Sequence, residues 1–486
     1  MSKIRPSVAV CLFVWGALPC VSQAADDVAA LRAELEALKQ DYASRVGALE
    51  ARINQIEAAQ GAVAAANTPP APAPLAATDS TPPAPPLLPA ADSTPAPSGG
   101  GGARGGQSAF NPAISMILAG NYASLSADPS SYRIAGFLPS GGDVGPGARS
   151  FNLGESELTV AANVDPYFFA NVTASVTADN QISVEEAYFR TLALHDGFTV
   201  KGGRFFSGLG YLNEIHAHAW DFVDQPLVYQ AFFGGQLAQD GLQVKWIAPT
   251  DTFIELGAEA GNGDRFPGTQ RDRNGLNGTT LFAHVGGDIG ESTSWRTGFS
   301  WNDSRSDHRG YEDLDAFGAP VQNAFTGTAR TWVVDGLMKW APSGDSTRRQ
   351  LKLQGEYMRR TEDGQLAFDT TGANLSGDYR SRQSGWYVQG VYLFQPRWRI
   401  GARYDSLDSG DPRIGLVRSG ALTRAAFPTL LSASPDRFTI MLDWSPSEFS
   451  RLRGQYAWDE SRLDERDRQF QLQYIYAIGA HGAHKF

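Results

Sequence analysis

From residue 110 to the C-terminus, many segments of nine to fourteen residues alternate apolar and polar positions, and turn residues separate them. Such alternation predicts β-strands with one apolar and one polar face. The same region has no apolar stripe with a period of 3.6 residues, so we predict no amphipathic helix there. We predict sixteen strands, at 112–125, 151–164, 167–178, 181–193, 198–206, 241–248, 251–261, 278–289, 293–302, 330–341, 349–360, 384–395, 397–406, 436–445, 448–460 and 468 to the C-terminus.

The connections between these strands alternate in length. Short turns, such as 164–166, 249–251 and 445–447, alternate with loops of sixteen to thirty-four residues, and the connection at 179–180 breaks the rhythm. Short turns at one end and long loops at the other are typical of outer-membrane barrels. The predicted fold class is therefore all-β, a transmembrane antiparallel β-barrel of about 16 strands over residues 110–486, with its short turns in the periplasm.

Tryptophan positions favour a membrane barrel over a soluble sandwich, which would show the same alternation. Nine tryptophans fall on the apolar face of their strands, mostly near strand ends, where an aromatic girdle would lie. The opposite face carries many charges, which a dry core would hold only at a large desolvation cost, so we expect a water-filled lumen. The nine are Trp246, Trp295, Trp301, Trp332, Trp340, Trp386, Trp398, Trp444 and Trp458.

Three segments precede the predicted barrel. Residues 1–24 combine a basic start, an apolar core and a small-x-small end, which predicts a signal peptide and export. Apolar residues recur every seven positions within 25–60, which favours a short periplasmic coiled coil over a single helix lying on another surface. The Pro-, Ala- and Gly-rich stretch 61–109 cannot bury a core, so we predict a disordered linker, for which peptidoglycan is a candidate contact.

Composition narrows the alternatives. No run of eighteen apolar residues follows the leader in this 486-residue chain, which excludes membrane-spanning helices. Both cysteines, Cys11 and Cys20, lie in the leader, so we expect neither disulfides nor thiolate metal sites, and Pro19 disfavours a lipoprotein signal at Cys20. Removing the leader with Lys3 and Arg5 changes the net charge from −11 to about −13, and this acidic balance argues against nucleic acid as a partner.

The end of the sequence carries a separate signal. Apolar residues alternate with polar ones from 470 to 478, Tyr476 among them, and the sequence ends on Phe486. A terminal aromatic residue after such a strand resembles the assembly signal of bacterial outer-membrane barrels. We therefore expect the barrel assembly machinery and outer-membrane lipid to be partners.

The longest connection, 207–240, is the third on the long-loop side and is rich in aromatic residues. In position it resembles the loop that folds into the lumen of sixteen-stranded porins and narrows it. A solvated loop would not need so many aromatic side chains, so we expect this one to pack against the inner wall.

Candidate metal ligands lie in this loop. His216 and His218 stand two residues apart, flanked by Glu214 and Asp221. Two imidazoles and a carboxylate supply three ligands of a Zn²⁺ site, with water or another residue as the fourth. The simpler alternative, which we favour, is that the histidines only hydrogen-bond the loop to the wall. The sequence requires no cofactor, and Zn²⁺ is a candidate bound or transported ion.

Two other histidine positions are weaker candidates. His481 and His484 have opposite strand parity, so a shared ion there would need a bulge. His284, with Asp288 on the same predicted face, is expected to be a solvated histidine of the lumen.

Charges of both signs are predicted to line the lumen. Facing basic and acidic walls would create a transverse field that orients polar solutes, although any aqueous pore needs charged lining residues. A strongly anion-selective channel would need a basic excess, which this acidic chain does not show. The basic residues are Arg399, Arg403, Arg451 and Arg453, and the acidic ones are Glu155 and Glu157 with Asp224, Glu214 and Asp221 of the loop.

Three sequence stretches suggest a family. NEIHAHAWDF, FFGGQLAQDGLQVKWIAPTD and the terminal GAHGAHKF, behind a leader, coiled coil and Pro-rich linker, resemble a group of Gram-negative outer-membrane proteins often labelled zinc-regulated TonB-dependent outer-membrane receptors. The architecture is also similar to that of phosphate-selective porins with an N-terminal coiled coil. The resemblance implies outer-membrane transport with a link to zinc supply.

The function that we expect is a porin-type channel of the outer membrane for small polar solutes or ions, homotrimeric through the barrel and the coiled coil. An energised zinc-uptake receptor is the second hypothesis, although such receptors have twenty-two strands and a plugged lumen. A structural anchor between membrane and cell wall is the third. We do not expect an enzyme, because no nucleophile, base and orienting group form a recognisable arrangement.

Overall fold

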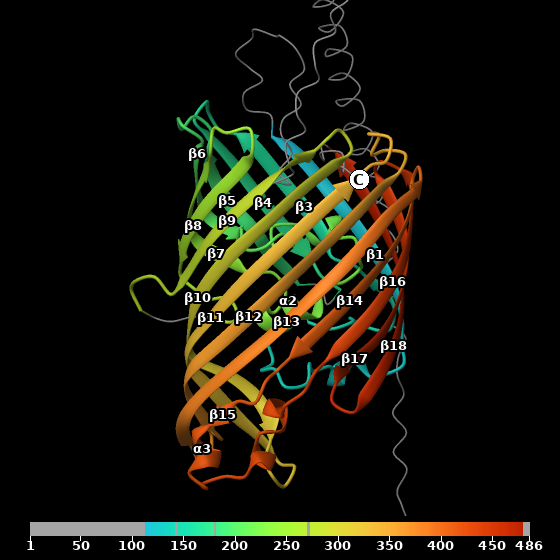
Figure 1. The fold of residues 1–486 in the computed structure, drawn as a ribbon. Coiled ribbons are helices and arrows are strands. Elements are labelled where there is room, and N and C mark those ends of the chain that lie inside the picture. The colour runs from blue at the N-terminus through green and yellow to red at the C-terminus, as the bar shows by residue number, and fades with distance from the viewer. Residues whose placement is uncertain (1–111, 141–143, 179–180, 270–272, 480–486) are drawn as a thin grey trace, which may run out of the picture. The chain divides into compact units, whose positions relative to one another are not determined.

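The computed structural model describes residues 112–140, 144–178, 181–269 and 273–479 (Figure 1). The predicted leader, coiled coil and linker lie outside these residues, as do His481, His484 and Phe486, so the hypotheses about them stay predictions. Among the described residues, none of the helices has the length and apolar character needed to cross a membrane.

The described strands form one closed antiparallel sheet, which confirms the predicted barrel (Figure 1). They are β1 (Ala113–Leu125), β2 (Ser150–Leu153), β3 (Ser156–Asn163), β4 (Phe168–Val176), β5 (Ile182–Thr191), β6 (Phe198–Phe206), β7 (Ala238–Ile247), β8 (Phe253–Gly261), β9 (Gly278–Ile289), β10 (Thr293–Leu314), β11 (Pro320–Trp340), β12 (Gln350–Phe368), β13 (Leu375–Gln395), β14 (Trp398–Asp408), β15 (Arg413–Ile414), β16 (Asp436–Ser447), β17 (Ser450–Arg462) and β18 (Glu465–Gly479).

Going around the barrel, the wall consists of sixteen strand positions, which we call staves. β2 and β3 share one stave because both pair with β1, and the two-residue β15 belongs to the loop between β14 and β16. The first and last strands close the sheet, since β1 pairs with β18 from Ser115↔Gly479 to Leu125↔Gln469. The described helices are short and lie in loops: η1 (Pro129–Ser131), η2 (Ala217–Ala219), α2 (Leu227–Phe233), α3 (Gly415–Arg418), η3 (Arg424–Ala426) and η4 (Pro428–Leu430).

The outer face of the barrel is apolar and bounded by tryptophans. All nine strand tryptophans share strand parity with exposed apolar residues such as Val244, Val334 and Ile400, which confirms that they point outward. Five lie near the short turns and are called the turn-side tryptophans, and four lie farther along and are called the loop-side tryptophans. The turn-side set is Trp246, Trp295, Trp340, Trp398 and Trp444, and the loop-side set is Trp301, Trp332, Trp386 and Trp458.

The separation of the two sets fits a lipid bilayer. Trp332 and Trp340 on β11 are eight residues apart, which corresponds to about 26 Å of strand and to less along the membrane normal once the strand tilts. Outer-membrane barrels have an apolar band about 25 Å tall between aromatic girdles. The exposed residues between these two positions include Val334 and Met338, which suit contact with acyl chains.

Strands β10 to β13 extend well beyond the loop-side tryptophans, toward the lower end in Figure 1 where β15 and α3 lie. We expected loops at 303–329 and 361–383, and this was wrong, because most of these residues continue the two hairpins. Their outward residues are polar, as in the pairs Arg330–Asp303, at 3.0 Å, and Arg380–Asp363. Outside the bilayer the outer face needs no apolar residues, so the alternation that marks a strand disappears.

The expected alternation of connection lengths therefore holds only in part. Four connections on the loop side are long and three of the described ones are short, because hairpins replace the missing loops. The long ones are 126–149, 207–237, 262–277 and 409–435, and the short ones are 315–319, 369–374 and 463–464.

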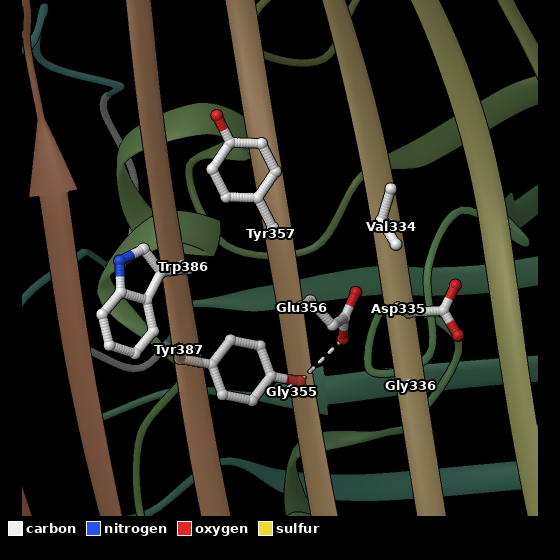
Figure 2. Close-up of a pocket in the computed structure, with 8 residues that line it drawn as sticks. All are labelled: Val334, Asp335, Gly336, Gly355, Glu356, Tyr357, Trp386 and Tyr387. Atoms are coloured by element: carbon white, nitrogen blue, oxygen red, sulfur yellow. Dashed lines mark hydrogen bonds between the residues drawn. The ribbon is translucent and has the colours of Figure 1, made fainter.

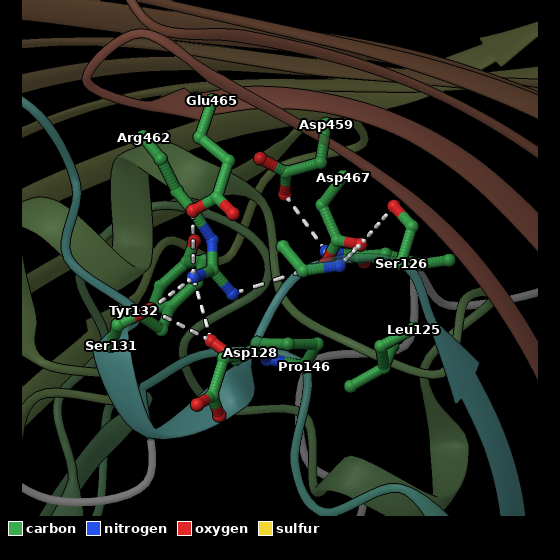
Figure 3. A network of polar contacts seen from close by, with 12 residues as sticks. Leu125, Ser126, Asp128, Ser131, Tyr132, Pro146, Asp459, Arg462, Glu465 and Asp467 are labelled. Carbon is green, nitrogen blue, oxygen red and sulfur yellow. Dashed lines mark hydrogen bonds and ion pairs between the residues drawn. The ribbon is translucent and has the colours of Figure 1, made fainter.

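Two of the long connections pack inside the barrel wall. The loop 409–435 fills the space inside the extended hairpins, where Phe427 and Leu430 contact a cluster that includes Phe325 and Tyr379. The loop 126–149 is fastened to β17 and β18. Arg462 donates to the carbonyl of Asp128 at 2.7 Å, and Asp467 accepts from the amide of Ala127 at 2.9 Å (Figure 3).

Candidate constriction site in the barrel lumen

The connection between β6 and β7, residues 207–237, folds into the lumen, and we name it L3. Its helix α2 is buried from end to end, and the left-handed Gly234, at φ 67°, ends it. The apolar side of α2 packs on four neighbouring strands of the wall, which confirms the predicted inward packing. The wall residues in this cluster are Val333, Met358, Tyr387 and Leu407.

The side chain of Asn213 hydrogen-bonds to both ends of L3. The side-chain amide of Asn213 donates to the carbonyl of Ser207 at 2.8 Å and to that of Leu237 at 2.9 Å. Its side-chain oxygen accepts from the amide of Leu237 at 2.8 Å. Since Asn213 is fully buried, these bonds hold the entry and exit of the loop together, beside the backbone bond from the amide of Ser207 to the carbonyl of Leu237 at 2.9 Å.

Glu356 on β12 anchors the first turn of L3. It accepts from the amides of Tyr211 and Leu212, at 3.3 and 3.0 Å, and from the hydroxyl of Tyr229 at 2.9 Å. Tyr387 on the adjacent β13 donates to it at 2.7 Å, as Figure 2 shows. A carboxylate that accepts four bonds in a buried place fixes the loop in one position.

Asp221 of L3 binds the basic part of the wall. Its carboxylate lies 2.8 Å from Lys352 Nζ and 3.1 Å from Arg399 Nη1. Burial alone would raise the pKa of this carboxyl, but Lys352 and Arg399 hold the pKa of Asp221 well below its ordinary value. Asp221 is therefore ionised and paired with the wall.

Asp224, three residues farther along L3, makes the same kind of contact. Its carboxylate lies 2.9 Å from Arg403 Nη2 and 2.5 Å from Arg437 Nη1, and Gln455 donates to it at 2.9 Å. These partners outweigh the effect of burial and lower the pKa of Asp224. Arg437 was not among the residues that the sequence predicted.

The backbone of L3 also contacts the wall arginines. Arg453 Nη2 donates to the carbonyl of Trp220 at 2.8 Å, and Arg451 Nη1 donates to the carbonyls of His218 and Trp220, both at 3.3 Å. The structure thus places Arg399, Arg403, Arg451 and Arg453 on the inner face, all four bonded to L3. We expected basic and acidic groups that face each other across water, but Asp221 and Asp224 of L3 contact the basic wall directly, whereas Glu157 contacts the histidines of L3 and Glu214 contacts Lys245.

The two histidines of L3 meet glutamates of the opposite part of the wall. His216 Nδ1 lies 3.2 Å from Glu157 Oε2 and 3.1 Å from Glu185 Oε2, and His216 Nε2 lies 3.1 Å from Glu186 Oε2. His218 Nδ1 lies 2.7 Å from Glu157 Oε1. Burial disfavours the imidazolium, but the charge of Glu157 and the hydrogen bonds to the three glutamates raise the pKa of His216 well above its ordinary value.

Two predicted neighbours of the histidines lie elsewhere. Glu214 pairs with Lys245 at 3.0 Å, and Asp221 pairs with Lys352 and Arg399 as described above, so neither joins the histidines. Glu157, which we predicted as a pore-lining residue, is the one that does. Glu155 lies at the interruption between β2 and β3 and is exposed.

The sequence analysis missed Glu185 and Glu186. The register of β4 and β5 shifts there, with Thr173 opposite Glu186 and Ala174 opposite Val184, so Glu185 is the extra residue of a β-bulge. A bulge turns two consecutive side chains toward the lumen. Consecutive glutamates in an otherwise alternating strand were the signal that could have shown it.

Two further expectations can be compared with the structure. We expected His284 to be solvated, and this was wrong, because it is fully buried and bonds Glu255 at 2.9 Å, whereas Asp288 is exposed. Tyr476 lies on the outward face of β18, in the alternation expected for the assembly signal.

Distant likenesses to solved structures cover the barrel. A loop-deletion form of OmpT, an outer membrane protein of Vibrio cholerae, is 11% identical with a TM-score of 0.48 over 76% of this chain and 99% of that one. The outer membrane channel DcaP of Acinetobacter baumannii is 12% identical with a TM-score of 0.44, over 76% and 97%. An anion-selective porin from Comamonas acidovorans is 10% identical with a TM-score of 0.45, over 76% and 99%. These likenesses are too distant to transfer a function.

The apolar belt between two sets of tryptophans, the closed sheet and the inward-folded L3 define a class: a transmembrane β-barrel whose lumen a loop constricts. No known family model matches the sequence. The chain is 32% identical over 358 residues to an uncharacterized protein of Aquifex aeolicus (strain VF5), which covers 70% of both chains. It belongs to the same family as that protein.

Proposed function

We propose that the protein is a porin-type channel of the outer membrane for small polar solutes or ions. The observation that carries this proposal is the charged inner wall of a closed barrel, with L3 bonded across it. Pores select by their width and by the charges and hydrogen-bond groups that line them, and L3 supplies both here.

Passage is passive in this proposal. Energised outer-membrane receptors have twenty-two strands around a plugged lumen, whereas this barrel has sixteen staves narrowed by its own loop. An energised zinc receptor remains the alternative that the sequence resemblance suggests, and zinc remains a candidate cargo. The chemistry of a pore needs no catalytic residue, so we propose no enzymatic activity.

A structural anchor is a second candidate, and one observation favours it. Arg360, Arg403, Arg437 and Arg453 point inward, yet each is almost completely buried. Such burial means that L3 and the wall pack closely, which fits a barrel that holds the membrane without conducting.

Single-channel conductance in a planar bilayer distinguishes these functions. We expect stable, small current steps from the purified full chain, and larger steps from Asp224→Asn, because this change weakens the bonds of L3 to Arg403 and Arg437. Arg330 lies on the outer face of an extended hairpin, so the variant Arg330→Gln is the control, and we expect it to leave the conductance unchanged. Absence of current from the parent and from Asp224→Asn would contradict the channel and favour the anchor.

We further propose that the protein is a homotrimer. The heptad pattern within residues 25–60 and the apolar outer wall of the barrel support this assembly. The alternating end of the sequence, with Tyr476 and Phe486, supports delivery by the barrel assembly machinery, and the linker at 61–109 supports contact with peptidoglycan.

A further inference from the structure

The cluster around His216 differs in composition from the rest of the L3 interface. The three carboxylates of L3, Glu214, Asp221 and Asp224, each lie against a lysine or an arginine. At the cluster the wall instead supplies glutamates, and histidines of L3 face them. We name His216, His218, Glu157, Glu185 and Glu186 the histidine–glutamate cluster.

The cluster concentrates negative charge in a buried place. The side chain of Glu157 is 2% exposed, and those of Glu185 and Glu186 are each 9% exposed. Oε1 of Glu185 is buried and has no hydrogen-bond partner within the described residues. Buried carboxylates at such density need positive charge among them, which either an imidazolium or a divalent cation in its place can supply.

The ligand atoms have the spacing that a metal ion needs. His216 Nδ1, Glu157 and Glu185 each offer one atom, and these atoms lie within 4.8 Å of one another. Two of the separations are 3.1 and 3.2 Å. In a tetrahedral site with bonds of about 2.0 Å, neighbouring ligand atoms are about 3.3 Å apart, so a cation would replace the Nδ1 proton with little movement.

The remaining two members hold the ligands in position. Glu186 lies 3.1 Å from His216 Nε2, so it accepts the proton there and leaves Nδ1 to face Glu157 and Glu185. His218 bonds the other oxygen of Glu157 at 2.7 Å and so orients the Oε2 that faces His216. Metal-binding histidines commonly have a carboxylate on the second nitrogen.

We propose that His216 Nδ1, Glu157 and Glu185 bind a divalent transition-metal cation, with Zn²⁺ as the representative ion, and that the ion ties L3 to β3 and β5. Imidazole and carboxylate together suit Zn²⁺ better than Mg²⁺ or Ca²⁺, which prefer oxygen ligands alone. Binding itself does not depend on the proposed channel, whereas an effect of zinc on conduction rests on it.

Titration calorimetry of the purified full chain in detergent, with Zn²⁺ alone as the probe, tests the site. We expect one equivalent of zinc to be lost in His216→Ala and in Glu185→Gln, and binding about 10- to 100-fold weaker in Glu186→Gln. His308→Ala, which removes an exposed histidine, and a variant without His481 and His484 are the controls and keep this equivalent. Heat-modifiable migration in gels shows that each variant is folded.

Spectroscopy and conductance separate the possible failures. Co²⁺ in place of Zn²⁺ should give intense visible absorption bands in the parent and in the controls, and these should disappear in His216→Ala. Equal zinc binding by the parent and His216→Ala, or none by either, would overturn the site even if current persists. A third outcome is that the parent binds zinc and His216→Ala does not, while neither the parent nor Asp224→Asn conducts current. That outcome would overturn the channel and keep the metal site.

Discussion

At the scale of single residues, the inner wall depends on charged groups that are buried and paired. Arg403 and Arg453 are almost fully buried, and both bond L3 as well as a wall carboxylate, Asp405 and Asp443 respectively. Removing one partner of such a pair costs more than the pair contributes, because the other charge stays buried without compensation. Single substitutions in this interface should therefore change the position of L3 before they affect the barrel.

Glu356 offers the clearest test of this dependence. Glu356→Leu leaves two amides and two hydroxyls without their acceptor, at about 1–3 kcal/mol for each buried group, so we expect L3 to detach in part. Limited proteolysis of the folded barrel should show faster cleavage within residues 207–237. Tyr357→Phe changes the next residue, which points outward (Figure 2), and should leave the cleavage rate unchanged. Equal protection in both variants would contradict the anchoring role.

Acid should also release L3, and the sign follows from Asp221 and Asp224. Both carboxyls have a lowered pKa in the folded protein, so their stabilisation is complete above the unfolded value near 3.9 and is lost as pH falls through the folded values. We expect this contribution to stay constant from neutral pH down to about pH 4.5 and to be lost only in stronger acid.

Proteolysis with an acid-active protease, followed across pH, measures the release. Asp221→Asn has no titrating group at position 221. Its L3 should therefore be cleaved faster than that of the parent above pH 4.5, and its cleavage rate should rise less than that of the parent below pH 4.5. A transition of the parent centred near pH 6 that Asp221→Asn retains would show that other groups control the loop.

At the scale of elements, the membrane boundary explains the two kinds of strand. Between the tryptophan sets the outward residues are apolar, and beyond them β10 to β13 continue with polar residues on the outer face, while their inner face carries buried residues such as Phe325 and Tyr379. The same backbone geometry thus carries two different sequence patterns, and the surrounding medium decides which one occurs.

Paired arginine substitutions on β11 test where this boundary lies. Val334 faces outward between Trp332 and Trp340, so Val334→Arg should destabilise the barrel in vesicles by more than about 1 kcal/mol, toward the about 2–4 kcal/mol expected at the bilayer midplane. Thr328 faces outward beyond Trp332, and Thr328→Arg should cost only about 0–1 kcal/mol. Urea titrations of folding into vesicles measure both, and equal costs would contradict the assigned boundary.

Sequence patterns predicted the elements well where lipid dictates them. All sixteen staves and the outward tryptophans follow from alternation, because one face must be apolar. The extensions of β10 to β13 did not follow, because water on the outer side removes that requirement. Strand propensity alone was too weak to extend the prediction through 303–329 and 361–383.

The site was predicted in part for a similar reason. L3 and its two histidines stand out by aromatic content and by the spacing of His216 and His218. The partners of these histidines could not be predicted in the same way. Glu214, a neighbour in sequence, pairs with Lys245 instead, and Glu185 reaches the lumen only through a bulge. Contacts between a loop and a distant wall depend on registers that the pattern of one strand does not contain.

At the scale of the whole molecule, oligomer formation is open to a direct test. Chemical crosslinking of the full chain in membranes should give trimers, and removal of residues 28–56 should weaken them if the coiled coil contributes. Trp246→Ala, on the outer surface, is a useful comparison for contacts made by the barrel itself. Monomers alone, with or without residues 28–56, would contradict the trimer.

Closure of the sheet has a consequence for how the protein is made. Among the described strands the partner of β1, the first in the sequence, is β18, the last, so the edge of β1 stays uncovered until β18 has been made. A chain that stops anywhere before Glu465 leaves β1 and another strand with exposed edges, which invite pairing with other chains. Ring closure therefore requires β18 to be present: a chain that contains β18 can cover both edges, and a chain that ends before it cannot.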